Sequence, residues 1–245
     1  MQRYKRKIEY EGTPFVGWQF QKNGPSIQEV LQKAIFNFSN EKVIVTGAGR
    51  TDSGVHALAQ VAHFDLKKKI KDKKLLPAIN QNIGDQPVTI LKINKTNKKF
   101  HARHNAKKRT YRYLIVNRQS PLALQKNKAW HIRKKLNIKN MKKGAKFLLG
   151  THNFSTFRAA SCGAKSPIKT MEKISIKKIK DTIFLEFTSR SFLQQQVRSM
   201  VGCLKYLGEG KWNLKEFIDS FKSKNRKSCA PPAPACGLYL KQINY

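Results

Sequence analysis

The stretch GAGRTDSGVHA, residues 47–57, stands between two apolar runs, and the fold can be built outward from it. Residues 43–45 and 58–66 on its two sides have the composition and spacing of strands, so the stretch is predicted to be a loop between two strands of one sheet. Its glycines permit turns that a side chain would block. Asp52, two positions after Arg50, is then either a turn-capping residue or the carboxylate of a functional site.

Outward from this loop, the periodicity of apolar residues predicts two successive α/β halves. The first half has predicted strands at 4–10, 43–45, 58–66 and 88–93, and helices at 27–38 and 75–83, with a basic turn at 67–74. The second half has predicted strands at 110–116, 174–176, 183–187 and 238–243, and helices at 138–149, 191–207 and 214–221. Two of the helix starts have capping-box spacing, at Ser26 with Glu29 and at Ser191 with Gln194.

Each half follows the order strand, helix, strand, strand, helix, strand with variations, which is the order of an RNA-recognition-like domain. The predicted fold class is therefore α+β, with two RNA-recognition-like α/β halves and mostly antiparallel sheets. Residues 100–109 have no apolar period and form a basic connector. We place the boundary there, between an N-terminal domain of residues 1–105 that carries the Asp52 loop and a C-terminal domain of residues 106–245.

The charge balance points to a polyanionic partner. The chain has 50 Lys and Arg against 14 Asp and Glu, a formal net charge of +36, and nucleic acid is the commonest partner of such a protein. A general lysine bias with a solvated surface accounts for part of this excess, and an anionic membrane surface is a weaker rival. No apolar run approaches the ~18 residues of a spanning helix, and the N-terminus lacks the apolar core of a signal peptide.

Cysteine and histidine usage predicts neither disulfides nor a metal site. The cysteines, Cys162, Cys203, Cys229 and Cys236, contain no Cys-x-x-Cys pair and are expected to be reduced thiols of a cytoplasmic protein. His101 and His104 have no cysteine or carboxylate beside them in the sequence to complete a metal shell. The chain also lacks the P-loop, the dinucleotide-binding glycine motif and the Gly-x-Ser-x-Gly motif. What remains is a cofactor-free reaction centred on one carboxylate, a class that on nucleic acid includes base isomerisation and glycosidic-bond chemistry.

Three side chains of the second half are further candidates. Arg198 borders the apolar stripe of its helix, so it either reaches solvent or fixes and keeps ionised the Asp52 carboxylate. Tyr111 and Tyr113 lie two apart on one face of a strand, where paired rings usually pack in a core but can also stack on nucleobases. The connector at 100–109 mixes basic residues with an aromatic ring, which suits a phosphate backbone with unstacked bases.

Several blocks, in this order along the chain, match one known family. They are FVGWQ at 15–19, GRTDSGVHA at 49–57, RTYRY at 109–113, GTHNFSTF at 150–157, VRSMVG at 197–202 and ACGLYL at 235–240. Together they resemble the tRNA pseudouridine synthase A (TruA) family, and the resemblance covers nearly the whole chain. Two segments depart from the family: Gln194, Gln195 and Gln196 stand where relatives often have aromatic or histidine residues, and residues 162–167 are a short form of a variable loop.

The resemblance implies a cofactor-free enzyme that isomerises uridine to pseudouridine at positions 38, 39 and 40 of the tRNA anticodon stem-loop, by flipping the target base out of the stack. Asp52 would be the catalytic aspartate, either attacking the nucleoside or abstracting a proton. Tyr111 would stack on the uracil, Arg198 would pair with Asp52, and Arg50 would fill the place of the flipped base. The remaining expected RNA contacts are Gln19, Thr51, His56 and Arg109.

The family also implies two halves joined around a central basic cleft, and a homodimer that binds tRNA. Two other functions fit parts of the sequence. A catalytically silent RNA-binding protein would explain the charge but gives Asp52 no role. A ribosomal-type structural protein would carry basic tails, whereas the lysines here are spread through periodic segments.

Overall fold

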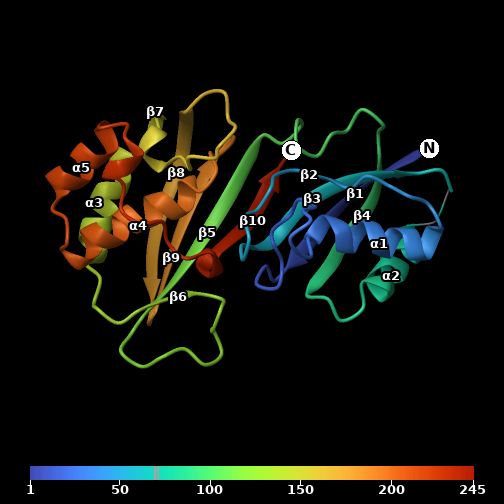
Figure 1. The fold of residues 1–245 in the computed structure, drawn as a ribbon, viewed down its shortest axis with the longest axis horizontal. Helices are drawn as coiled ribbons and strands as arrows, with labels where there is room; N and C mark the ends of the chain where they lie inside the picture. The colour runs from blue at the N-terminus through green and yellow to red at the C-terminus, as the bar shows by residue number, and fades with distance from the viewer. Residues whose placement is uncertain (69, 71) are drawn as a thin grey trace. The chain divides into compact units, whose positions relative to one another are not determined.

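The computed structural model describes residues 1–68, 70 and 72–245, and it divides the chain into two compact units. The first unit is Met1–Lys107 with Tyr239–Tyr245, and the second is Lys108–Leu238 (Figure 1). Lys69 and Lys71 of the expected basic turn lie outside the described residues. The predicted α+β class with mostly antiparallel strands is confirmed.

The first unit has the predicted order of elements. They are β1 (Gln2–Tyr10), α1 (Ile27–Ser39), β2 (Thr46–Gly47), β3 (His56–Leu66), α2 (Asp72–Ile83) and β4 (Val88–Thr96), with β10 (Leu238–Asn244) returning from the chain end. β1 pairs antiparallel with β3 and β4, and β3 pairs with β2 and, in parallel, with β10. The last strand, which we assigned to the second half, thus belongs to the first unit.

One strand of the first unit begins later than the sequence predicts. Residues 43–45 are not a strand, and β2 starts only at Thr46. The backbone of Val45 is bound by side chains of α1: Gln32 Oε1 accepts from its N–H at 3.1 Å, and Gln28 Nε2 donates to its carbonyl at 2.9 Å. These bonds replace a strand ladder at this residue.

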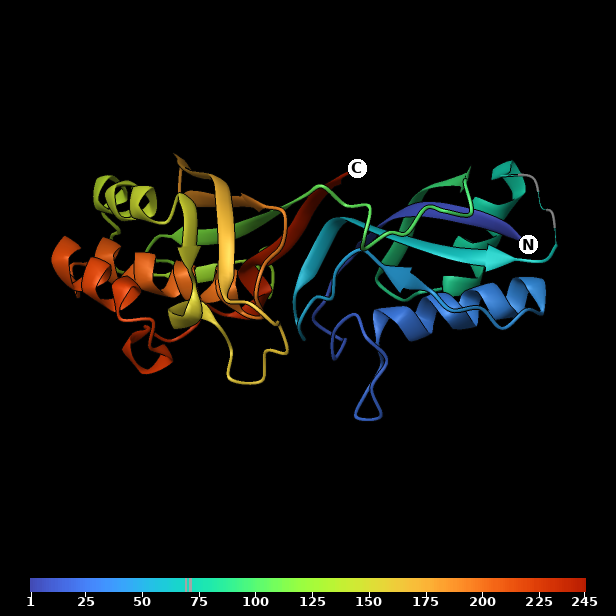
Figure 2. The same ribbon diagram turned by 90° about the horizontal axis from the view of Figure 1, so that it is seen from above.

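The sheet of the first unit has one face covered by helices. Figure 2 shows α1 running along this face, and Ser26 begins the helix by accepting from the Glu29 N–H at 3.2 Å. Alternate residues of β1 point toward the helices and are buried, namely Tyr4, Arg6, Ile8 and Tyr10. The other residues of β1 lie on the opposite side, which we call the open face.

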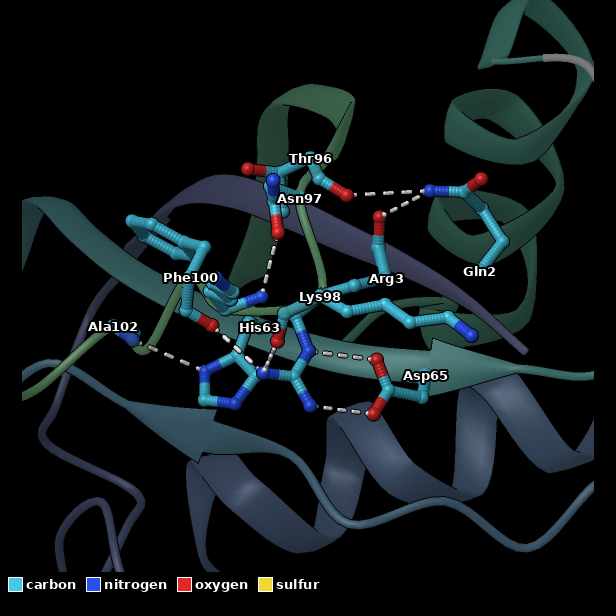
Figure 3. Close-up of polar contacts among 10 residues, drawn as sticks. Gln2, Arg3, His63, Asp65, Thr96, Asn97, Lys98, Phe100 and Ala102 are labelled. Carbon is cyan, nitrogen blue, oxygen red and sulfur yellow. Dashed lines mark hydrogen bonds and ion pairs between the residues drawn. The ribbon is translucent and has the colours of Figure 1, made fainter.

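Part of the open face is covered by the connector that follows β4. The Arg3 guanidinium forms a paired contact with Asp65 at 2.7 and 2.8 Å and also donates to the carbonyls of Lys98 and Phe100 (Figure 3). His63 Nδ1 accepts from the Ala102 N–H at 3.2 Å. Burial is the main reason that the pKa of His63 falls to about 4, so this ring is neutral and can keep accepting.

The second unit is built on a sheet in the order β5-β9-β8-β7, with β6 parallel to β5. Its elements are β5 (Lys108–Asn117), β6 (Trp130–Ile132), α3 (Ile138–Phe147), β7 (Gly150–Asn153), β8 (Ile168–Ile179), β9 (Thr182–Ser189), α4 (Gln196–Glu209) and α5 (Leu214–Lys222), with short 3-10 turns at Ser155–Phe157, Arg226–Ser228 and Ala235–Gly237. The three helices pack on one another, as Figure 1 shows. The short strands β6 and β7 were not predicted.

The start of α4 corrects a prediction. Ser191 and Gln194 do not cap this helix, which begins at Gln196 after Gln195 in the left-handed region with φ 61°. The Ser191 N–H instead donates to the Ser189 hydroxyl in the turn that ends β9, at 3.3 Å. A capping box that we did not predict, formed by Asn213 and Glu216, begins α5.

Cys162, Cys203, Cys229 and Cys236 form no disulfide among the described residues. Cys203 and Cys229 nevertheless meet, with their sulfur atoms 3.5 Å apart. No helix among the described residues has the length and hydropathy to cross a bilayer.

Candidate active site

Asp52 lies in a tight turn between β2 and β3. Its carbonyl accepts from the Val55 N–H at 3.1 Å, and Gly54 has a φ of +74°, which few side chains tolerate. Asp52 itself is half-buried and Arg50 is exposed. The turn therefore fixes the backbone of the carboxylate while leaving the preceding arginine in solvent.

A second loop, residues 12–19, supports this turn from one side. Gly17 and Asp52 form an isolated antiparallel bridge, and the Trp18 N–H donates to the Thr51 carbonyl at 3.1 Å. The hydroxyl of Ser53 donates to the Phe15 carbonyl at 3.2 Å. The rings of Phe15 and Trp18 are buried. The loop that carries these rings therefore supports the Asp52 turn through its backbone contacts.

The same turn is held from β3 by a glutamine. Gln60 is fully buried, and its Nε2 donates to the Gly49 carbonyl at 2.8 Å. The preceding residue, Ala48, donates its N–H to the Val61 carbonyl at 2.7 Å. Asp52 is thus anchored on both sides. One feature of the sequence pointed to a role for Gln60: it is a polar residue on the same face of β3 as the apolar residues Ala62 and Phe64.

Two of the residues expected to contact RNA have buried side chains in this loop region. His56 is 1% exposed, its Nδ1 accepts from the Gly12 N–H at 2.9 Å, and its ring stacks on Tyr239 at 4.7 Å. Thr51 is 7% exposed, and its hydroxyl bonds to the Tyr10 hydroxyl at 2.8 Å. Both side chains therefore position the loop.

Gly12→Ala is expected to disturb the Asp52 turn, because a Cβ at residue 12 would lie 2.1 Å from the Val55 carbonyl oxygen. Such overpacking costs about 1–3 kcal/mol of unfolding free energy. Gly163→Ala is the matched control, since a Cβ there meets nothing within 4 Å. Thermal unfolding of the two variants measures the difference, and equal melting temperatures would contradict the expectation.

In the second unit, Tyr111 lies on β5 opposite Phe187. It is 9% exposed, and its ring meets Phe192 edge-on with the centroids 5.0 Å apart. Tyr113, on the same strand face, is fully buried, and its hydroxyl donates to the Pro234 carbonyl at 2.7 Å. Tyr113 is therefore a core residue. Tyr111 is also buried, and its ring packs against Phe192, a neighbour that sequence reasoning missed.

Arg198 lies near the start of α4 and is bound to the loop at 230–234. Its Nε donates to the Ala233 carbonyl at 2.7 Å, and its own carbonyl accepts from the Ala233 N–H at 3.0 Å. This loop packs so closely that a Cβ at Gly202 would lie 2.1 Å from the Pro231 carbonyl oxygen. The Arg198 guanidinium is thereby held at its Nε in a defined direction.

The other predicted contact residues are Gln19, half-buried beside Trp18, and Arg109, half-buried on β5, where its Nη1 donates to the Arg190 carbonyl. Within the first unit the structure brings Gln19, Arg50, Thr51, Asp52 and His56 to one loop region. Arg109, Tyr111 and Arg198 belong to the second unit. Over the described part of the chain, no group of three or more histidine, cysteine or acidic side chains could hold a metal ion.

Comparison with known proteins identifies the family. The sequence model of the tRNA pseudouridine synthase family matches residues 8–105 and 145–245. The chain is 57% identical to the tRNA pseudouridine synthase A of Pelagibacter ubique, with 100% of both chains covered. It is 45% identical to the protein of that name from Maricaulis maris, covering 100% of this chain and 98% of the relative.

The α+β units and the family match define an isomerase of the pseudouridine synthase class. More narrowly, the chain belongs to the tRNA pseudouridine synthase family.

Proposed function

We propose that this protein converts uridine to pseudouridine at positions 38, 39 and 40 of the tRNA anticodon stem-loop, with Asp52 as the catalytic carboxylate. The observation that carries the proposal is the turn around Asp52, whose backbone is held by the loop at 12–19 on one side and by Gln60 on the other. Within a chain so similar to named synthases, this is an aspartate whose backbone is held in place before substrate arrives.

The chemistry needs one ionised carboxylate and no cofactor. The uracil must detach from the sugar, rotate and rejoin through carbon. Asp52 either attacks the nucleoside or removes a proton so that the base can leave, and both routes need the carboxylate held against the sugar. A backbone anchored on both sides supplies that placement without a reorganisation cost during the reaction.

The roles of the other residues follow from the family resemblance and from their surroundings. Tyr111 stacks on the flipped uracil, with its ring oriented by Phe192. Arg198 pairs with Asp52, and its attachment to Ala233 sets the direction of the guanidinium. Arg50, exposed at the turn, fills the place that the flipped base leaves in the stack.

Among the remaining predicted residues, the roles divide by exposure. Gln19 and Arg109 are partly exposed and contact RNA directly. Thr51 and His56 are buried and act through the shape of the loop. The protein works in the cytoplasm as a homodimer. A molecular mass from light scattering tests the homodimer directly.

The test uses purified protein and an unmodified tRNA transcript with uridine at positions 38, 39 and 40. We expect new pseudouridine at these positions, mapped by carbodiimide adducts that stop primer extension. A transcript with cytidine at the three positions is the control and should show none. Binding without any pseudouridine would favour the catalytically silent RNA-binding protein instead, and pseudouridine elsewhere would contradict the proposed positions.

A further inference from the structure

The part of the open face that the connector leaves uncovered contains a basic pocket. Its volume is about 240 Å³, and strands β1, β3 and β4 supply its walls. The residues that border it are Lys5, Arg6, Lys7, Val61, Lys92 and Asn94. None of these is acidic, and Val61 gives the pocket an apolar floor.

Two lysines of the pocket face each other across neighbouring strands. Lys7 of β1 and Lys92 of β4 are direct partners in the antiparallel register, and both are exposed. Like charges directly opposite on a sheet destabilise it. In the described part of the chain neither ammonium has an ion pair or a hydrogen bond. An anion between them would turn the repulsion into attraction.

A third lysine is held at the edge of the same pocket. Lys5 lies opposite Asn94 in the register, and its Nζ lies 3.8 Å from the centre of the Tyr245 ring and 4.7 Å from that of Phe100. These cation–π contacts hold the ammonium in place. Burial lowers the pKa of Lys5, and an anionic neighbour would offset that cost.

We propose that this pocket binds a phosphate group of the tRNA backbone, as a contact separate from the Asp52 loop. The inference rests on the proposed function, because it takes tRNA as the ligand. Lysine ammonium groups on several sides and the Asn94 amide match the several acceptor oxygens of a phosphate. None of the described residues that line the pocket is aromatic, and the nearby rings of Tyr245 and Phe100 contact the Lys5 ammonium, which favours a phosphate over a stacked base. The net charge of +36 favours a polyanion over a single acidic group.

The test compares two double variants in binding full-length tRNA over a series of salt concentrations. Lys7→Ala/Lys92→Ala removes the facing pair, and Lys139→Ala/Lys142→Ala removes two exposed lysines of α3 as a matched loss of charge. For the pocket variant we expect an affinity roughly 10-fold lower than that of the control. We also expect a salt slope, log K against log salt, shallower by about 1, the effect of losing one phosphate contact.

Thermal unfolding separates binding from folding. Removing the facing charges should leave the melting temperature unchanged or higher, because only repulsion is lost. Equal affinity and slope in the two double variants would overturn the proposal, and this is also the result if an acidic protein is the true occupant. A loss of affinity that comes with a lower melting temperature would overturn it as well. This experiment measures tRNA binding without turnover. If the pocket does not bind phosphate, the proposed formation of pseudouridine is not contradicted, because that activity is measured separately.

Discussion

Asp52→Ala is expected to lower the rate of pseudouridine formation by at least about 10³-fold, because it removes the carboxylate that must attack the nucleoside or accept its proton. The fold should survive, since the turn is held by the Asp52 carbonyl and by bonds of Thr51 and Ser53. Binding of tRNA should also survive, because phosphate contacts by Lys and Arg supply most of the affinity. Single-turnover kinetics with tRNA in one assay, and binding in another, separate the two effects.

Asp52→Asn is the sharper version of this experiment. The amide keeps the size of the side chain and removes its charge and its basicity, so activity should fall about as far as in Asp52→Ala. Ser53→Ala is the control in the same turn, because it removes the bond from the Ser53 hydroxyl to the Phe15 carbonyl, which helps to hold the turn, and leaves the Asp52 carboxylate in place. A rate within tenfold of the wild-type rate in Asp52→Asn would remove Asp52 from the chemistry.

The loop at residues 47–57 shows which features of the site the sequence predicts and which it does not. Its position between two strands of one sheet could be predicted, because alternating apolar residues on β3 are a local pattern. The contacts that hold the loop in place could not be predicted from the sequence. Trp18 meets the Asp52 turn from more than thirty positions earlier in the sequence, and His56 looks like an RNA contact until its bond to Gly12 is seen. The sequence suggested that the glycines of the loop permit turns, but a Cβ at Gly47 would lie 2.6 Å from the Trp18 ring, so a glycine there also makes room for Trp18.

Predictions from local sequence patterns were also wrong where another hydrogen-bond partner was available in the folded chain. Ser191 and Gln194 have the spacing of a helix cap, but the hydroxyl of Ser189 binds the Ser191 N–H and α4 starts later. Val45 has the composition of a strand, but glutamine side chains of α1 bind its backbone. In each case the winning partner is a side chain whose position depends on the folded arrangement.

Arg6 is a buried cation on β1. It lies on the buried face of this strand with Tyr4, Ile8 and Tyr10, and it is 1% exposed. Its guanidinium lies 4.3 Å from the centre of the Phe64 ring. Neither Nε nor either Nη has a hydrogen-bond partner among the described residues. A buried cation with unpaired donors destabilises the fold.

Arg6→Met is therefore expected to raise the free energy of unfolding, by about 1–4 kcal/mol on the scale measured when buried charges are replaced by apolar side chains. Methionine suits the site because its unbranched, flexible chain can follow the path of the arginine stem over Phe64. Denaturant unfolding measures the change. Arg3→Met is the control on the same strand. It should destabilise, because it leaves Asp65 and the carbonyls of Lys98 and Phe100 without their donor.

The pH dependence of this difference tests its electrostatic origin. Burial lowers the pKa of Arg6 to about 9 from its ordinary 12.5, so between these values the unfolded chain binds the proton more strongly than the folded one. Stability then rises with pH in this window, and the penalty is fully present only below about pH 9. The advantage of Arg6→Met over the wild type should therefore shrink as the pH rises from 9 to 10.5. Subtracting the two proteins cancels the titration of lysines and tyrosines that both share. An advantage that stays constant over this range would mean that packing, and not the buried charge, is responsible.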